Sequence, residues 1–482
     1  SHPLALSLKN IEQTHGSITQ IELPNLSQVD VSDLLQDALY KSEEQVKSLV
    51  ELSLNKTKGN PFFLHQFINS LADENILFFE QSLGSWSWDI KEIIEQDITE
   101  NVVELMVQQL QKLPDITQYL LTYAAHLGSQ FDLDLLSAIN QSDSNYVATH
   151  LKHAIETGLI QPLTDDFQFR HSPELLLKAK FRFSHDRVQQ AAYSLTLSPG
   201  LKKLQLHVGL SLLNYCDKKG SFEGYLFTLL EQLNPAKGLL EYSLHPRLLA
   251  LNLEAAEKAK QSSAFKVALE FLQVAESLLP EQSWQKTPDD ALNVYKELSE
   301  VSYLAGEYEQ TEKLCQQQIE LATTINAKIT LTMVLIQLLQ TQRRFPEALD
   351  AAQNALALLD LKLPDDEETS QGLLVQEFEH MEQRIKDITA EDMLALPQIS
   401  EQQILQLLAL YESTLNPCYL TGRQFTYCLV ATRMTALTLT HGQCDITSIA
   451  VRSYMMTRAL FTKCSVLDTK LGWSQCTSHS HR

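Results

Sequence analysis

The stretch FRFSHDRVQQAAYSL, Phe181–Leu195, places Ser184, His185 and Asp186 side by side. These are the residue types of a hydrolytic triad, in which an acid orients a histidine that takes a proton from serine. A triad needs side chains that converge, whereas successive side chains of an extended segment point to opposite faces. We therefore predict no catalytic role. The simpler interpretation is a junction, in which a strand ends at FRF and Ser184 or Asp186 caps the following helix.

A second motif, KTKGNPFFLHQF, contains Gly59, Asn60 and Pro61. Glycine favours the left-handed conformation that ends a helix, asparagine caps helices, and proline suits a first helical position, where no N–H is needed. The motif thus predicts two helices broken at these residues. We expect three aromatic residues in the core of the second helix: Phe62, Phe63 and Phe67.

Several nucleotide and catalytic motifs are missing from this sequence. GxxxxGK[ST], GxGxxG, HRD, DFG and HExxH do not occur. Without a phosphate-binding loop or a kinase core, these 482 residues carry no visible machinery for phosphoryl transfer or hydrolysis. A set of metal-ligand types near the C-terminus matches no zinc module in its spacing, so we expect no metal site. Its members are Cys464, Cys476, His479 and His481.

Composition narrows the class of protein. The net charge of −22 disfavours a nucleic-acid or anionic membrane surface as the main partner. No apolar run is long enough for a membrane helix, so we expect no membrane insertion. The seven cysteines include no CxxC pair, which is typical of reduced thiols in a cytoplasmic protein.

The hydrophobic patterns predict a mostly helical chain of several parts. Residues 1–94 contain a short strand at Ile18–Leu26, helices, and a hairpin around Gly84. Residues 95–200 predict three helices followed by a late β-hairpin, the outline of a winged-helix domain. Residues 450–482 lose this periodicity, and we expect a disordered or non-native end there.

Residues 201–449 contain a degenerate repeat. Three segments superpose with spacings of 43 and 37 residues, close to the period of helix-pair repeats. An aromatic residue would wedge between paired helices, and a small residue three positions later would allow their close approach. We therefore predict a tetratricopeptide-like α-solenoid. The aligned residues are Phe265, Tyr308 and Phe345, and Ala268, Thr311 and Ala348.

Four segments together resemble the predicted-ATPase module of very large bacterial signal-transduction kinases: HPLALSLKNIEQTHGSITQIELPNLSQVDVSDLLQDAL, KTKGNPFFLHQFINSLADENILFF, WSWDIKEIIEQDITENVVELMVQQLQKLP and FRFSHDRVQQAAYSL. The resemblance extends to about residue 449. In that family a serine/threonine kinase-like domain precedes a STAND-type, AAA-related ATPase. A helical-repeat region follows, and then usually a GAF sensor and a two-component histidine kinase. The resemblance implies that the chain is a fragment whose partners include an upstream ATPase core and the kinase-like domain.

The resemblance also implies residue roles. Gly59, Asn60 and Pro61 match the family's lid motif, in which the proline packs near the adenine of ATP or ADP bound with Mg²⁺. His185 and Asp186 fall where related ATPases carry Met-His-Asp, with serine here in place of methionine. That histidine senses the β-phosphate of ADP. The helical repeats would bind a protein partner.

Two other functions remain open from the sequence. One alternative is a protein-interaction scaffold with no nucleotide role, which the missing phosphate-binding loop favours. A winged-helix transcriptional regulator is the third interpretation, but the expected wing, residues 156–180, carries no dense basic cluster.

Overall fold

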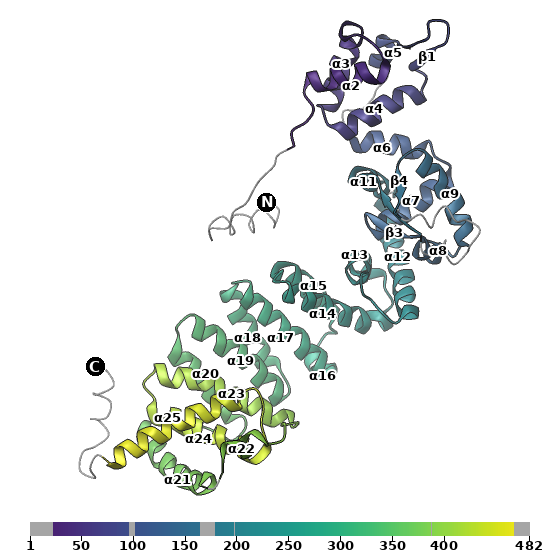
Figure 1. Cartoon of the computed structure of the whole chain (residues 1–482). Coiled ribbons are helices and arrows are strands. Elements are labelled where there is room, and N and C mark those ends of the chain that lie inside the picture. The colour runs from purple at the N-terminus through teal and green to yellow at the C-terminus, as the bar shows by residue number, and fades with distance from the viewer. Residues whose placement is uncertain (1–22, 96–101, 164–178, 197, 387, 467–482) are drawn as a thin grey trace. The chain divides into compact units, whose positions relative to one another are not determined.

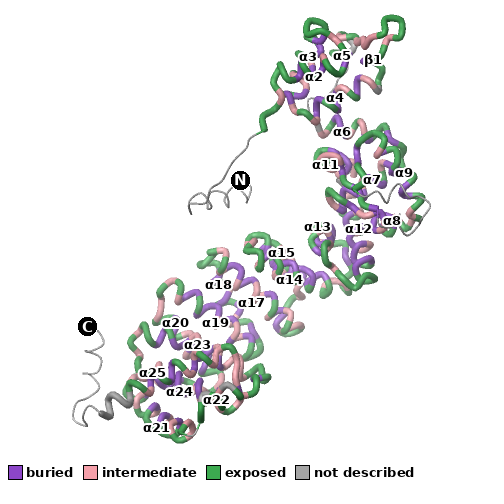
Figure 2. The backbone as a smooth tube through the Cα atoms, in the orientation of Figure 1, coloured by how far each residue is buried: buried purple, intermediate pink, exposed green. Residues whose placement is uncertain are grey.

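The computed structural model describes residues 23–95, 102–163, 179–196, 198–386 and 388–466. It is mostly helical, as predicted (Figure 1). The chain divides into two compact units, Ser1–Leu239 and Leu240–Arg482. Buried residues follow one side of most helices in both units (Figure 2). Within the described residues, no helix is both long and apolar enough to cross a membrane.

The first unit begins with three helices and a hairpin. Ser27 and Asp30 form a capping box at the start of the first helix, as expected for a Ser-x-x-acid pattern. The predicted hairpin around Gly84 is present, with Leu77 opposite Trp88 and Glu80 opposite Ser85. Residues 18–22 of the expected strand lie outside the described residues, and residues 23–26 form no strand. The elements are α2 (Gln28–Leu39), α3 (Glu43–Thr57), α4 (Pro61–Asp73), β1 (Leu77–Glu80), β2 (Ser85–Trp88) and α5 (Ile90–Glu95).

A winged-helix domain follows α6 (Val102–Gln111). Its elements are α7 (Asp115–Leu127), β3 (Gln130–Asp132), α8 (Leu133–Ile139), α9 (Ser144–Glu156), β4 (Ile160–Pro162), β5 (Lys180–Phe183) and α11 (Asp186–Ser194). The sheet order is β3-β5-β4, with both pairs antiparallel. The three helices and the late hairpin are the predicted winged-helix outline, whereas the strand β3 between α7 and α8 was not predicted. Residues 164–178, between β4 and β5, lie outside the described residues.

Two further helices belong to the first unit: α12 (Ser198–Lys219) and α13 (Leu226–Ala236). Polar side chains join them to the winged helix. The Tyr215 hydroxyl donates to Asp134 at 2.8 Å, and the Tyr225 hydroxyl donates to Asp132 at 2.6 Å. The Gln232 amide donates to the carbonyl of His126 at 2.9 Å. The sequence predicts helices rather than strands here but not these contacts, and it therefore groups residues 201–239 with the repeats.

The second unit is a series of packed helix pairs. Helices α14 (His245–Gln261) and α15 (Phe265–Leu278) pack together, as do α17 (Pro288–Leu304) with α18 (Tyr308–Leu321) and α19 (Ile325–Thr341) with α20 (Phe345–Ala357). Successive pairs also contact each other, which is the solenoid arrangement predicted from the repeat. A short helix, α16 (Ser283–Lys286), joins the first two pairs.

The three aligned aromatic residues each begin the second helix of a pair. The three aligned small residues, Ala268, Thr311 and Ala348, are all 0% exposed. The turn before each aromatic has one shared geometry, because its left-handed residue has φ of 58°, 83° or 60°. These left-handed residues are Ser263, Gly306 and Arg343.

A fourth turn of this kind joins α23 (Gln402–Leu420) to α24 (Gln424–His441), with Gly422 at φ 76°. This pair was not predicted from the sequence, because no aromatic residue starts α24.

An additional helix, α21 (Glu367–Ile385), packs against α24. Glu367 bonds Arg423, and Glu377 bonds Arg433, both with an offset of 56 residues. A constant offset means that α21 and α24 run parallel.

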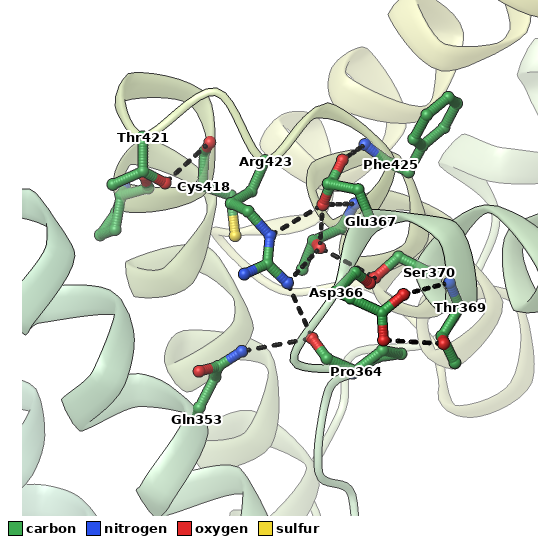
Figure 3. A network of polar contacts seen from close by, with 12 residues as sticks. Gln353, Pro364, Asp366, Glu367, Thr369, Ser370, Cys418, Thr421, Arg423 and Phe425 are labelled. Carbon is green, nitrogen blue, oxygen red and sulfur yellow. Dashed lines mark hydrogen bonds and ion pairs between the residues drawn. The ribbon is translucent and has the colours of Figure 1, made fainter.

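Glu367 lies at the centre of a polar network (Figure 3). Its carboxylate accepts from Arg423 Nε at 2.9 Å, from the Phe425 amide at 2.7 Å and from the Thr426 hydroxyl at 2.6 Å. The Arg423 guanidinium also donates to the Pro364 carbonyl at 2.8 Å. This network joins the loop before α21 to the start of α24 and supplies acceptors for that helix's first amides.

The expected irregular end does not begin at residue 450. Helix α25 (Thr447–Val466) covers that position and packs against α24. The lost periodicity predicts disorder there, but the helix buries one face through Ala450, Tyr454 and Thr457. One more short helix, α22 (Ala390–Leu394), precedes α23. Residues 467–482 lie outside the described residues.

Candidate functional site

His185 lies at the junction between β5 and α11. Its ring nitrogen Nδ1 accepts a hydrogen bond from the Arg187 amide at 3.1 Å, so His185 is itself the N-cap of α11. The junction interpretation is confirmed, but neither Ser184 nor Asp186 is the cap. Both alternatives rested on common capping preferences, and here an imidazole nitrogen supplies the same acceptor.

Ser184 is committed to the sheet. Its hydroxyl donates to the Leu159 carbonyl at 3.1 Å, and its amide donates to the same oxygen at 3.0 Å. Asp186 contacts His185 Nδ1, and its side chain remains 75% exposed. The serine therefore bonds away from the histidine, and the three side chains form no relay.

Gly59 has a backbone role in the turn between α3 and α4. Its φ is +75°, and a Cβ at this position would lie 2.2 Å from the Leu26 carbonyl oxygen. The Leu26 amide in turn donates to the Gly59 carbonyl at 2.8 Å. Only glycine fits both the conformation and the close approach. Gly59 is buried, and its backbone conformation shapes the motif.

Asn60 and Pro61 start α4 as predicted. The Asn60 Oδ1 accepts from the Phe63 amide at 2.9 Å, and Pro61 occupies the first helical position. The Asn60 oxygen is therefore used within the chain. Pro61 is exposed, which leaves its ring accessible to a bound group.

Phe62 connects the two motifs. Its ring stacks on the imidazole of His185, with centroids 4.1 Å apart and planes 15° from parallel. Of the three expected core residues, Phe63 and Phe67 are 2% and 0% exposed, whereas Phe62 is only half-buried. This role of Phe62 was not predicted from the sequence. The sequence feature that could have indicated this role is the position of Phe62 directly after Pro61, which places it off the buried face of the helix.

The stack makes the two sequence motifs one site. Pro61, Phe62 and His185 come from segments more than 120 positions apart, yet two of their rings touch. When Nδ1 accepts from the Arg187 amide, the ring's proton lies on Nε2. That N–H is a donor suited to an anionic oxygen such as that of a phosphate. The site thus offers an exposed proline ring and an imidazole donor, and Asp186 keeps a carboxylate beside the imidazole.

Among the described residues, no group of three or more His, Cys, Asp or Glu side chains is arranged to hold a metal ion. The set of ligand types near the C-terminus lies outside the described side chains. Burial raises the pKa of the Cys315 thiol to about 11 and that of Cys418 to about 12. These thiols are packed in the second unit and are poor nucleophiles at neutral pH.

Comparisons with known proteins point to signalling. No family model matches the sequence. The chain is 27% identical to hybrid signal transduction histidine kinase G of Dictyostelium discoideum over 369 residues, which cover 65% of this chain and 11% of that protein. It is 22% identical to the peroxide stress-activated histidine kinase mak3 of Schizosaccharomyces pombe over 167 residues, 34% of this chain and 7% of that protein. The chain therefore spans about a tenth or less of the length of these relatives.

Among solved structures, the chain is similar to a STAND protein with a tetratricopeptide repeat sensor from Pyrococcus horikoshii. The identity is 10%, the TM-score is 0.24, and the match covers 90% of this chain and 66% of that one. The packed helix pairs and the histidine kinase similarities together indicate a helical-repeat protein related in sequence to signalling kinases.

Proposed function

We propose that this chain is the nucleotide-sensing lid, winged helix and protein-interaction arm of a larger signal-transduction ATPase/kinase. An upstream core would supply the phosphate-binding loop and the Mg²⁺ ligands. The lid is the segment from α2 to α5, which contains Pro61. The observation that carries the proposal is the stack of Phe62 on His185, because it brings the two sequence motifs into one site.

The residues present suit ATP or ADP. Pro61 would pack on adenine, since it is exposed at the start of α4. His185 would donate to a phosphate oxygen from Nε2, because its Nδ1 accepts from the Arg187 amide. Asn60 and Gly59 would act indirectly, by fixing the helix start and the turn before it.

The two contacts predict different nucleotide preferences. Adenine is common to ATP and ADP, so losing the Pro61 contact weakens both alike. A histidine that reads the β-phosphate of ADP distinguishes the two, so its loss changes their affinity ratio. The lid and winged helix would then respond to nucleotide exchange by shifting between two arrangements.

The test is a titration of the longer protein, with its ATPase core, against ADP and ATP. We expect Pro61→Ala to weaken both nucleotides about equally. We expect His185→Ala to weaken ADP by about 10-fold or more relative to ATP, since one hydrogen bond to a charged group is worth about 1.5–3 kcal/mol. His153→Ala is the matched control, because His153 is an exposed histidine of the same winged helix.

Unchanged affinity for both nucleotides in Pro61→Ala and His185→Ala would contradict the proposal and favour a plain scaffold.

The second unit supports a protein-binding arm in either case. A groove of about 790 Å³ lies between α15, α17 and α18. Its lining is mixed, with polar side chains such as Gln273, Glu276 and Lys313 beside Leu269, Leu298 and Leu314.

A further inference from the structure

We propose that Phe62 is a positioning residue, which fixes the ring plane of His185 and links the phosphate sensor to the lid. This inference rests on the proposed nucleotide function and adds a regulatory contact to it. The histidine would read the ligand, and the phenylalanine would carry the result into α4.

The position of Phe62 is set by its neighbours. The Asn60 cap and Pro61 fix the first turn of α4, so the Phe62 ring leaves the helix in a defined direction. The next residue, Phe63, is 2% exposed and belongs to the core, whereas Phe62 faces His185. The Phe62 ring therefore packs on the His185 imidazole rather than in the core of the lid.

His185 is held from its other side as well. The Arg187 amide donates to Nδ1 at 3.1 Å, whereas the Asp186 carboxylate, which also lies against Nδ1, adds no hydrogen bond when the proton is on Nε2. The imidazole is thus bonded at one edge to α11 and stacked on one face against α4. With planes only 15° from parallel, the stack limits the directions in which Nε2–H can point.

This arrangement couples two elements through one ring. A phosphate oxygen that draws the imidazole toward itself must slide or tilt the stack, and α4 then loses or gains a contact. Conversely, a lid that moves away frees the ring and weakens the donor's alignment. The coupling is reciprocal, as any linkage between two sites must be.

The first test needs no nucleotide. In the full 482-residue chain, with histidines labelled at ¹³Cε1, the His185 signal is assigned by its loss in His185→Ala. A ring proton over an aromatic face is shifted upfield, so we expect this signal to move downfield in Phe62→Leu. Phe62→Tyr keeps the ring and should restore the shift. Phe79→Leu, which removes an exposed hairpin phenylalanine, should leave it unchanged.

The second test uses ADP and ATP with the longer protein. We expect Phe62→Leu to weaken ADP relative to ATP by about 2- to 10-fold, the range for one aromatic pair. Phe62→Tyr should bind as the parent does. Phe62→Leu combined with His185→Ala should be no weaker than His185→Ala alone, because Phe62 acts through the histidine.

Three results would overturn the inference. An unchanged His185 signal in Phe62→Leu would mean that the stack does not form in solution. A shifted signal with unchanged nucleotide preference, where His185→Ala alters that preference, would mean that Phe62 has no positioning role. An unchanged preference in His185→Ala itself would remove the proposed function, and this inference with it.

Discussion

At the scale of single residues, Gly59 makes the sharpest stability prediction. Gly59→Ala forces a left-handed φ of +75° on a residue with a side chain and places its Cβ 2.2 Å from the Leu26 oxygen. We expect a loss of about 2–4 kcal/mol from conformational strain plus steric overlap. Denaturant unfolding followed by tryptophan fluorescence measures it, since two of the four tryptophans, Trp86 and Trp88, lie in the adjacent hairpin.

Gly84→Ala is the matched control, because Gly84 also has positive φ but a Cβ added there would meet no atom within 4 Å. It carries the strain alone, about 1–2 kcal/mol. Equal midpoints for the two variants would mean that the approach of Leu26 to the turn is not part of the folded state.

His126 predicts a pH dependence. Its Nδ1 bonds Gln232 at 2.9 Å, while its buried Nε2 has no hydrogen-bond partner among the described residues. Burial lowers the pKa of His126 below its ordinary 6.5, and the bond to Gln232 only partly opposes this. The unfolded chain therefore binds the proton more readily, and stability falls as the pH drops below about 6.5.

The expected slope is at most about 1.4 kcal/mol per pH unit, and it ends below the folded-state pKa. Thermal unfolding of the chain between pH 7.5 and 5 measures it. His126→Gln lacks this proton and should lose the His126 share of the slope, whereas His153→Ala, at an exposed histidine, should not. Identical slopes for all three proteins would contradict this role of His126.

Residue roles were predictable from sequence only where they depend on local chemistry. The Asn60 cap and the Pro61 helix start follow from neighbouring residues, and the structure has both. The His185 cap and the Phe62 stack were not predictable, because they depend on which elements meet in space. The roles of Pro61 and His185 toward nucleotide come from resemblance and stay predictions.

At the scale of elements, the repeat pattern predicts a packing cost. Ala348 is 0% exposed where α20 approaches its neighbours. We expect Ala348→Leu to destabilise the second unit by about 1–3 kcal/mol, because extra methyl groups in a close helix contact force the backbone to move. Ala357→Leu is the control, since Ala357 is an exposed alanine of the same helix. Equal stability of both variants would remove the close-approach role.

The polar network around Glu367 predicts a loss of stability when its charge is removed. Glu367→Gln keeps the shape but removes the charge that accepts from Arg423 and from the first amides of α24. We expect a loss of about 1.5–3 kcal/mol, the value of hydrogen bonds to a charged group. Urea unfolding compares it with Glu368→Gln, at the exposed neighbouring position. No difference between the two would mean that the network adds nothing to stability.

Helix pairs with an aromatic residue at the second helix were predictable, because the same wedge recurs in sequence. The pair α23–α24 was not, although its turn has the same left-handed residue, Gly422. The feature that this pair shares with the other pairs is the left-handed residue in the turn, not an aromatic residue at the start of the second helix. The parallel contact of α21 with α24 could not be predicted, because it depends on charged residues 56 positions apart.

At the scale of the whole molecule, we propose one signalling protein in which the first unit senses nucleotide and the second unit is a helical-repeat arm. The fold class was predictable because hydrophobic periodicity sets helices and hairpins locally. Helices α12 and α13 were placed with the repeats because helices of either unit share the same pattern, and only contacts such as Tyr215 with Asp134 separate them. The bounds of the four predicted parts stay predictions, apart from residue 450, which α25 covers.

The most direct measurement of the central claim is hydrogen–deuterium exchange of the longer protein with and without ADP. We expect slower amide exchange in residues 61–73 of α4 and 186–194 of α11 when ADP binds, and loss of that protection in α11 for His185→Ala. Protection confined to the upstream core, with α4 and α11 unchanged, would contradict the claim.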